Sequence, residues 1–200
     1  MSSKGMWSLK LSTAAIALIP AAIGINYLGK LFAGLLKLPL WLDSIGTVLA
    51  SMLAGPVIGA LSGIINNLIY GVTVDPISTV YAITSGAIGL IVGMLAYKGW
   101  IANVKKAIGI GFVVGFAAAI ISTPLNIIFW GGQTGNVWGD AFYAFLLSNH
   151  LPVWIASFGD SIVVDVPDKV VTVIISFLIF KGLPKTMTNI YRNDKDIEEL

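Results

Sequence analysis

The chain has 200 residues, of which 56% are hydrophobic and 11% charged, and its mean hydropathy is +0.89. Because soluble domains carry about 25% charged residues, this composition excludes an ordinary soluble protein and predicts an all-α integral membrane protein in a lipid bilayer. The net charge of +2 says little by itself, and we expect no nucleic-acid partner; the absence of cysteine excludes disulfides and thiolate metal sites.

The chain begins with a short basic segment, residues 1–10, that contains Lys4 and Lys10. A first long helix is predicted from about Leu11 to Leu36, with a kink at Pro20 that membrane helices tolerate. This apolar run is too long for the core of a signal peptide and has no small-x-small cleavage site, so we expect it to stay in the membrane.

Small residues form a stripe on this first helix. Ala17 and Ala21 are spaced four apart, and Ala14 lies one turn before Ala17. Such spacing lets a second helix approach closely. The residues leave open whether that helix belongs to the same chain or to a partner protein.

The stretch from Leu42 to Tyr70 is predicted to form two short helices that turn at Gly55-Pro56. Each run has about 14 residues and is roughly 21 Å long, short for a hydrocarbon core of about 30 Å. We therefore expect a helical hairpin within the membrane, shielded by longer neighbours. Asp43, which precedes it, is a candidate N-cap.

Two further helices are predicted at about Ile77–Tyr97 and Ala107–Trp130, separated by a loop rich in lysine. Asp75-Pro76 is a typical helix start before the first of them. Each helix carries glycines at GxxxG spacing, namely Gly89 and Gly93 in the first and Gly111 and Gly115 in the second.

Residues 131–165 are the most polar long stretch. Its apolar pieces, Phe142–Leu147 and Val153–Phe158, are too short to span, and we interpret them as interfacial or re-entrant. The alternative is a seventh span through 139–163, which would bury several polar side chains at membrane depth.

The last helix is predicted from Pro167 to about Phe180. Lys169 falls in its first turn, where the helix dipole disfavours a cation. Two explanations remain open, an ion pair with Asp165 or contact with an anionic ligand group.

Six helices place both termini on one side of the membrane, together with the loop that holds Lys98, Lys105 and Lys106. The positive-inside rule makes that side the cytoplasm. The prediction is a single six-helix membrane domain over residues 1–192, with a short second and third helix, followed by a charged cytoplasmic tail over 193–200.

Enzymatic signatures are absent from the sequence. There is no GxxxxGK[ST] phosphate loop and no GxSxG motif, and one histidine without cysteine makes no metal-ligand cluster. We therefore expect no enzyme, no cofactor and no metal.

Amides and aromatic side chains gather on the predicted outer side, in the loops and at the adjoining helix ends. Such a lining suits a small polar ligand with flat or apolar parts. The alternative is an aromatic belt with solvated loops. The candidate substrate-binding residues, with Lys169 included, are Asn66, Asn67, Tyr70, Tyr81, Asn126, Trp130, Gln133, Trp138, His150 and Lys169.

The chain resembles the substrate-binding S component of an energy-coupling factor (ECF) vitamin transporter over most of its length. The stretches that carry the resemblance are IPAAIGINYLGKL (19–31), LPLWLDSIGT (38–47), AGPVIGALSGIINNLI (54–69) and DVPDKVVTVIISFLI (165–179). Their order and spacing, more than any single motif, make the resemblance specific.

The resemblance implies six helices with cytoplasmic termini in a prokaryotic plasma membrane and high-affinity binding of a vitamin or vitamin precursor. It also implies docking on a transmembrane coupling protein and two cytoplasmic ATPases of an ABC-type importer. The docking face is an Ala-x-x-x-Ala face that Ala17 and Ala21 match, and Ala14 is the further candidate docking residue. Pantothenate is the first expectation for the substrate, and cobalamin is the alternative. The competing classes are a non-transport membrane subunit or sensor, and a self-sufficient secondary transporter.

Overall fold

The computed structural model describes residues 13–191, and this part of the chain contains helices and connections but no strand. The all-α prediction is therefore confirmed for these residues. Lys4, Lys10 and the tail 193–200 lie outside the described residues. The elements are α1 (Thr13–Leu35), α2 (Ile45–Ala54), α3 (Pro56–Thr73), the 3₁₀ helix η1 (Pro76–Thr79), α4 (Ala82–Tyr97), α5 (Val104–Trp130), α6 (Val137–Ser148), α7 (Val153–Gly182) and α8 (Lys185–Ile190).

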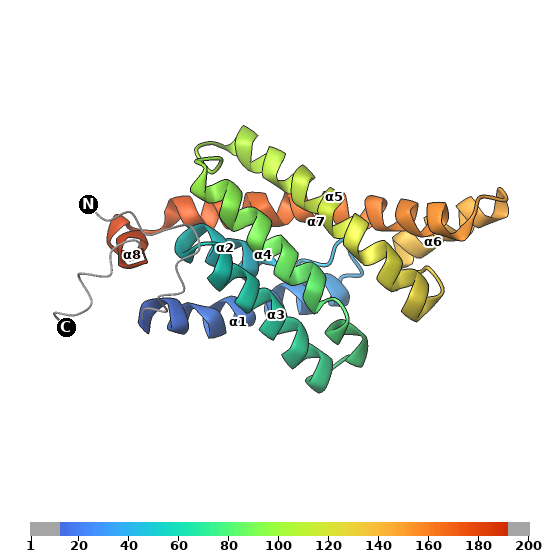
Figure 1. Cartoon of the computed structure of the whole chain (residues 1–200), viewed down its shortest axis with the longest axis horizontal. Helices are drawn as coiled ribbons and strands as arrows, with labels where there is room; N and C mark the ends of the chain where they lie inside the picture. Colours follow the sequence, from blue (N-terminus) through green and yellow to red (C-terminus); the bar gives the residue numbers. More distant parts are fainter. Residues whose placement is uncertain (1–12, 192–200) are drawn as a thin grey trace.

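The helices form an elongated bundle with two different ends (Figure 1). At one end lie the start of α1, the α2–α3 turn, the α4–α5 connection and the end of α7; we call this the turn end. Towards the other end lie the connections 36–44, 74–81 and 131–136, which we call the three-loop end. The α6–α7 hairpin extends beyond these three connections.

The predicted hairpin turns at Gly55, where φ is 91°, because glycine adopts positive φ without strain. The two helices are unequal, however: α2 has 10 residues and α3 has 18. Only α2 is short, and α3 is long and apolar enough to cross a membrane. The prediction of two short helices was wrong for α3, which continues through Tyr70 because its last turn packs against η1.

The last long helix differs most from the prediction. It begins at Val153, not at Pro167, and its 30 residues include Pro167 in the interior. The stretch 137–148 is a helix, α6, that lies beside the first half of α7 (Figure 1). The predicted interfacial or re-entrant pieces therefore form α6 and the first turns of α7. A proline next to acidic residues looked like a helix start, but here it lies inside α7, and the adjacent Asp168 accepts hydrogen bonds from the distant 36–44 connection.

Both GxxxG pairs mark places where helix backbones lie in contact. A Cβ on Gly111 would lie 2.6 Å from the Cα of Val170, and one on Gly115 would lie 2.7 Å from the Cα of Val166. These glycines hold α5 against the middle of α7. Gly89 and Gly93 similarly bring α4 onto the backbone of α3. The GxxxG spacing noted in the sequence thus coincides, at both pairs, with close helix approach.

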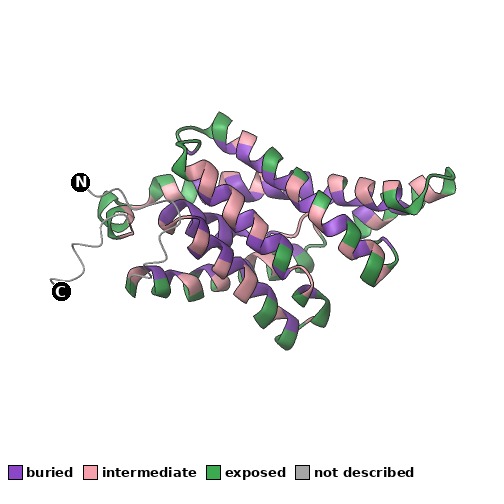
Figure 2. Ribbon diagram, viewed as in Figure 1, coloured by how far each residue is buried: buried purple, intermediate pink, exposed green. Residues whose placement is uncertain are grey.

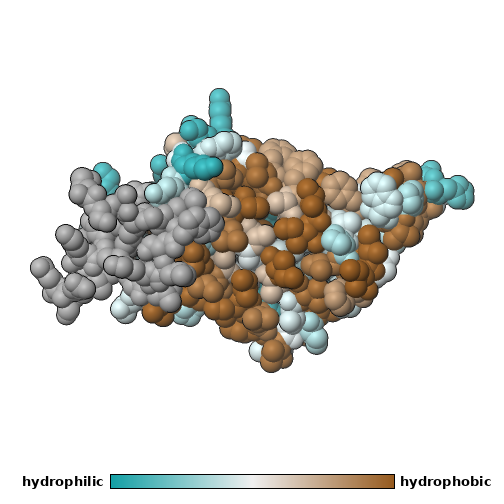
Figure 3. Space-filling view, in the orientation of Figure 1, coloured by the Kyte–Doolittle hydropathy of each residue, from teal (hydrophilic) through white to brown (hydrophobic). Residues whose placement is uncertain are grey.

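The bundle buries polar side chains and exposes apolar ones on its flanks. Leu28, Ile120 and Ile128 are each more than 60% exposed, and exposed residues follow the outer helix faces (Figure 2). The visible face over α3, α4 and α5 is mostly hydrophobic, while hydrophilic residues gather near the α4–α5 connection and the α6–α7 turn (Figure 3). Such a surface is typical of a protein immersed in lipid.

By length and composition, α1, α3 and α5 are each able to cross a membrane. Together with the apolar flanks, they are the features of a helical membrane protein.

Candidate functional site

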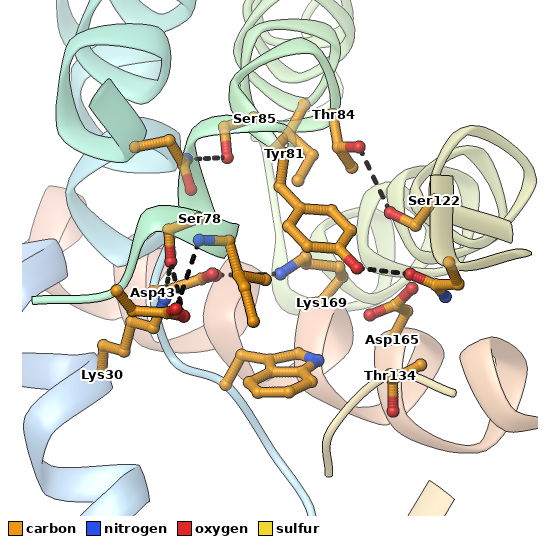
Figure 4. Close-up of a pocket in the computed structure, with 16 residues that line it drawn as sticks. Lys30, Asp43, Ser78, Tyr81, Thr84, Ser85, Ser122, Thr134, Asp165 and Lys169 are labelled. Carbon is orange, nitrogen blue, oxygen red and sulfur yellow. Dashed lines mark hydrogen bonds and ion pairs between the residues drawn. The ribbon is translucent and has the colours of Figure 1, made fainter. Parts of the chain in front are cut away.

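A cavity of about 130 Å³ lies where the three loops meet the helix ends (Figure 4). Its walls come from α1, α3, α4, α5 and α7, from η1 and from the connections 36–44 and 131–136, so that segments far apart in the sequence share one site. Among the described residues that line it are two ammonium groups and three carboxylates: Lys30, Lys169, Asp43, Asp75 and Asp165.

Lys169 lies at the centre of a buried ion cluster. Its Nζ is 2.5 Å from the carboxylate of Asp168 and 3.3 Å from Oδ1 of Asp43. The second oxygen of Asp168 accepts hydrogen bonds from the backbone N–H groups of Trp41 and Leu42, at 3.0 and 2.8 Å. Because a carboxylate is a strong acceptor for such bonds, Asp168 holds the 36–44 connection against α7. Trp41 is thereby fixed in the cavity wall.

This geometry corrects the placement of Lys169. It lies in the interior of α7, not in a first turn, and its ion pairs are with Asp168 and Asp43, not with Asp165. The helix dipole, which acts at the ends, no longer bears on the choice of lysine here. The sequence pattern missed these partners because one is adjacent in the chain and the other comes from a distant connection.

Asp43 is likewise not the cap of α2. That helix begins after Ser44, and its free N–H groups at Gly46 and Thr47 donate to Oδ1 of Asn26 in α1, at 2.7 and 3.2 Å. The Asn26 amide in turn donates to the Thr47 hydroxyl at 2.9 Å. Asp43 is therefore free to face Lys169, and the start of α2 depends on a side chain from another helix.

The charge state of Asp43 follows from its neighbours. Burial by itself raises the pKa of this carboxyl, but the Lys169 and Lys30 ammonium groups outweigh burial and hold its pKa below the ordinary value of 3.8. Asp43 is thus a carboxylate at neutral pH. Its side chain is 22% exposed, so it remains within reach of the cavity.

Lys30 reaches the cavity from α1. Its Nζ donates to the hydroxyl of Ser78 in η1 at 2.9 Å and lies 3.9 Å from the ring centroid of Tyr70. The ring of Tyr27 packs 5.3 Å from that of Tyr70. A cation over an aromatic face is stabilised by the ring quadrupole, so Lys30 is held at the cavity edge by α3 and η1.

Hydrogen bonds between neighbouring helices form the opposite wall. The Tyr81 hydroxyl donates to Oδ1 of Asn126 at 2.5 Å, and the Asn126 amide donates to the hydroxyl of Ser161 at 3.1 Å. Burial raises the pKa of Tyr81 to about 12, so the hydroxyl keeps its proton and acts as a donor. About one helical turn from the Tyr81–Asn126 pair, the hydroxyls of Thr84 in α4 and Ser122 in α5 are 3.2 Å apart.

The loop 131–136 is held over the site by two carboxylates. The backbone N–H of Thr134 donates to Asp140 and to Asp160, both at 3.1 Å, and its hydroxyl donates to Asp160 at 2.8 Å. These bonds connect the start of α6 to α7 and place Thr134 in the cavity wall. The side chain of Asp160 is thus occupied by the loop and does not line the cavity.

Four of the predicted substrate-binding residues, Asn67, Tyr81, Asn126 and Lys169, line this cavity. Two more line a second hollow of about 230 Å³ that shares Lys30 and Trp41 with the first; they are Tyr70 and Trp138.

The remaining four predicted residues line neither space. Asn66 is buried within α3, and Trp130 is half-buried at the end of α5. Gln133 is exposed in the loop 131–136, and His150 is exposed at the α6–α7 turn. The predicted outer cluster therefore does not form one site. Some of its residues line the two spaces, some are buried among the helices, and Gln133 and His150 are exposed outside them.

The prediction missed most of the charged lining, above all Lys30, Asp43 and Asp165. Each looked like an ordinary residue at a helix end or membrane boundary. The sequence did contain one signal for them, because these charged residues lie within or next to apolar stretches. Carboxylates and lysines buried in a membrane are costly and usually mark a functional site.

The lining of the cavity presents hydrogen-bond donors, acceptors and charged groups in fixed positions. Such groups can bind and orient a small polar molecule. Within residues 13–191 no group of three or more histidine, aspartate or glutamate side chains is placed to hold a metal ion.

The small-residue stripe of α1 lies away from this cavity. Ala17 and Ala21 are exposed, and Ala14 is half-buried. The structure places no other described helix over Ala17 and Ala21, so this face is open to lipid or to another protein.

Comparison with known proteins gives no match for this chain: no family model fits it, and neither the curated proteins nor the solved structures include a significantly similar one.

Proposed function

We propose that this protein is the membrane-embedded substrate-binding S component of an ECF-type importer for a small water-soluble vitamin or vitamin precursor. The observation that carries the proposal is the charged cavity towards one end of an apolar helical bundle, bordered by three connections. A protein that lies in lipid and buries so many ionisable groups around one cavity is equipped to take a polar solute out of water.

The proposed topology uses α1, α2, α3, α4, α5 and α7 as the six membrane helices, with α6 as an accessory helix on the outer side. The turn end carries Lys98, Lys105, Lys106 and Lys181. By the positive-inside rule this end faces the cytoplasm, together with both termini, and the three-loop end faces outward. The cavity then opens towards the side from which an importer collects its substrate, in the plasma membrane of a prokaryote.

The proposed partners are a transmembrane coupling protein and two cytoplasmic ATPases, which supply the energy that this chain has no motif to supply. The exposed face around Ala17 and Ala21 is the proposed docking surface for the coupling protein. Small side chains let a partner helix approach closely, which favours association in lipid.

The two expected substrates differ in how they suit the cavity. Cobalamin is far larger than a cavity of about 130 Å³, whereas pantothenate is much closer to it in size. The pantothenate carboxylate, however, would meet a lining with three carboxylates and two ammonium groups. We therefore keep the proposal at the level of a small vitamin or precursor, with pantothenate as one candidate.

Affinity purification of the tagged chain from its native membranes tests this proposal. We expect a coupling protein and two ATPases to co-purify, as identified by mass spectrometry, and the isolated chain to carry a small molecule in native mass spectrometry. A chain that co-purifies with neither, and that binds no small molecule from a vitamin mixture, would be a sensor or structural subunit instead.

A further inference from the structure

Asp165 is the one carboxylate of the cavity lining, among the described residues, that has no hydrogen-bond or ion-pair partner there. It is 8% exposed, and it points into the cavity from α7 (Figure 4). The other lining carboxylates are engaged: Asp43 pairs with Lys169, and Asp75 accepts from the backbone N–H of Ile77. A buried carboxylate without a partner is costly, so its retention requires an explanation.

Lys169 does not satisfy Asp165, although it lies four residues later on the same helix. Its ammonium group is directed to Asp168 at 2.5 Å and to Asp43 at 3.3 Å. Lys30 is held at the far edge by Ser78 and the Tyr70 ring. Both lysines of the lining therefore have other partners, and neither forms an ion pair with Asp165.

Several neutral side chains of the same wall donate to partners other than Asp165. The Tyr81 hydroxyl donates to Asn126, whose amide donates to Ser161. The Thr134 side chain and backbone donate to Asp160 and Asp140. None of these groups donates to Asp165, so a donor on a molecule in the cavity would give this carboxylate a partner.

We propose that Asp165 binds a cationic nitrogen of the ligand, so that the site takes a small molecule with an ammonium or other protonated nitrogen. This inference rests on the proposed binding function and names its substrate class. Trp41 and Tyr81 add aromatic surface to the lining, which stabilises a cation and a flat ring alike. A ligand of this kind is a cation or a zwitterion, and it would bring a positive charge to a lining in which carboxylates outnumber ammonium groups.

The first experiment determines the charge of the bound molecule. The full chain, purified in detergent, is incubated with a small-molecule extract of cells, separated from unbound compounds and heat-denatured; the released compounds are then passed over cation and anion exchangers at neutral pH. We expect the specifically bound compound to be retained by the cation exchanger or, as a zwitterion, to show a basic nitrogen by mass spectrometry. A bound compound without a basic nitrogen, pantothenate included, would overturn the inference but leave the proposed binding function standing.

The second experiment assigns the contact to Asp165. Asp165→Asn keeps the shape of the side chain and removes its charge, and it is expected to weaken binding of the isolated compound by roughly tenfold or more, the scale of a charge-assisted hydrogen bond. Lys105→Gln is the control, because it also removes one charge, and Lys105 is exposed at the turn end and does not line the cavity.

The outcomes are distinguishable. Unchanged affinity in Asp165→Asn would show that Asp165 does not contact the ligand. An equal loss in both variants, with lowered melting temperatures, would assign Asp165 a structural role and overturn the inference. If no extract yields a bound compound, the proposed function fails and this inference fails with it.

Discussion

Lys169 is a buried ammonium whose partners come from two parts of the chain, the adjacent Asp168 and the distant Asp43. Removing the ammonium leaves the fully buried carboxylate of Asp168 and the partly buried carboxylate of Asp43 without their ion-pair partner. Lys169 therefore holds the 36–44 connection against α7 and also lines the cavity. Its role is decided by these contacts and not by its sequence position after Pro167.

Lys169→Met keeps most of the apolar stem and removes the charge, and it should lower the free energy of unfolding by about 3–5 kcal/mol, the cost of breaking a buried ion pair. Thermal unfolding in detergent measures the effect. Lys37→Met is the control, since Lys37 is exposed on the same connection and should change stability little. Equal melting temperatures for the Lys169 variant and the wild type would show that the ion cluster is not formed.

Asp43 gives a pH dependence with a definite sign. Its pKa in the folded protein lies below 3.8, so the stabilisation from its ionised form is present above that value and is lost as the pH falls through the folded pKa. The difference in melting temperature between wild type and Asp43→Asn should be constant from about pH 7 to about pH 5 and shrink in more acidic buffer. A difference that grows on acidification would reverse the assigned shift.

At the level of elements, α2 and α5 begin in contrasting ways. The start of α5 is capped locally by Asn103, whose side chain accepts from the N–H of Lys106 at 3.0 Å. The start of α2 is capped by Asn26 from α1 through two N–H groups and the Thr47 hydroxyl. A local cap stabilises one helix, whereas the cap of α2 also fixes how two helices pack.

Asn26→Ala should therefore destabilise the protein by about 2–3 kcal/mol, because it leaves buried N–H groups unsatisfied. Asn103→Ala removes an exposed cap and should cost about 1 kcal/mol. Both are read from thermal unfolding of the purified chain. If the two variants lose the same stability, the connection between α1 and α2 does not depend on Asn26.

The contact between α5 and α7 is tested in the same way. Gly111→Ala places a Cβ 2.6 Å from the Cα of Val170 and should cost about 1–3 kcal/mol through overpacking. Gly109→Ala is the matched control on the same helix, where the nearest atom to the new Cβ is 3.8 Å away. The control should be neutral or slightly stabilising, because alanine favours helix. A Gly111 variant as stable as the control would mean that the helices are further apart than described.

For the whole molecule, the cavity and the small-residue face of α1 are separate features. Ala21 is exposed and does not line the cavity, so a bulky residue there should disturb a partner helix and leave the binding site unchanged. This separation allows binding and transport to be tested independently.

Ala21→Trp should retain ligand binding and abolish uptake in cells, or in vesicles that contain the coupling protein and ATPases, if α1 is the docking helix. Ile120→Trp is the control, because Ile120 is 61% exposed on α5 and should tolerate a large lipid-facing side chain. Uptake that survives in the Ala21 variant would place the docking surface elsewhere.

The sequence predicted what depends on local composition and pattern. Apolar runs predicted most of the helices, and Gly55-Pro56 predicted the hairpin turn. The GxxxG spacing was visible in the sequence, and the structure shows that α4 and α5 pack closely at these glycines. Asn67, Tyr81, Asn126 and Lys169 were found as candidate lining residues, because polar side chains near helix ends of a membrane protein are rare and conspicuous.

Only the tertiary structure decided the start of α7, the cap of α2 and the charged composition of the cavity. In each case the deciding partner is distant in sequence: Trp41 and Leu42 satisfy Asp168, and Asn26 satisfies Gly46. Asp165 and Pro167 have the local pattern of a helix start, yet they lie inside a 30-residue helix. A local pattern cannot distinguish an acidic cap from an acidic ligand contact, because the difference lies in which groups the folded chain brings to that side chain.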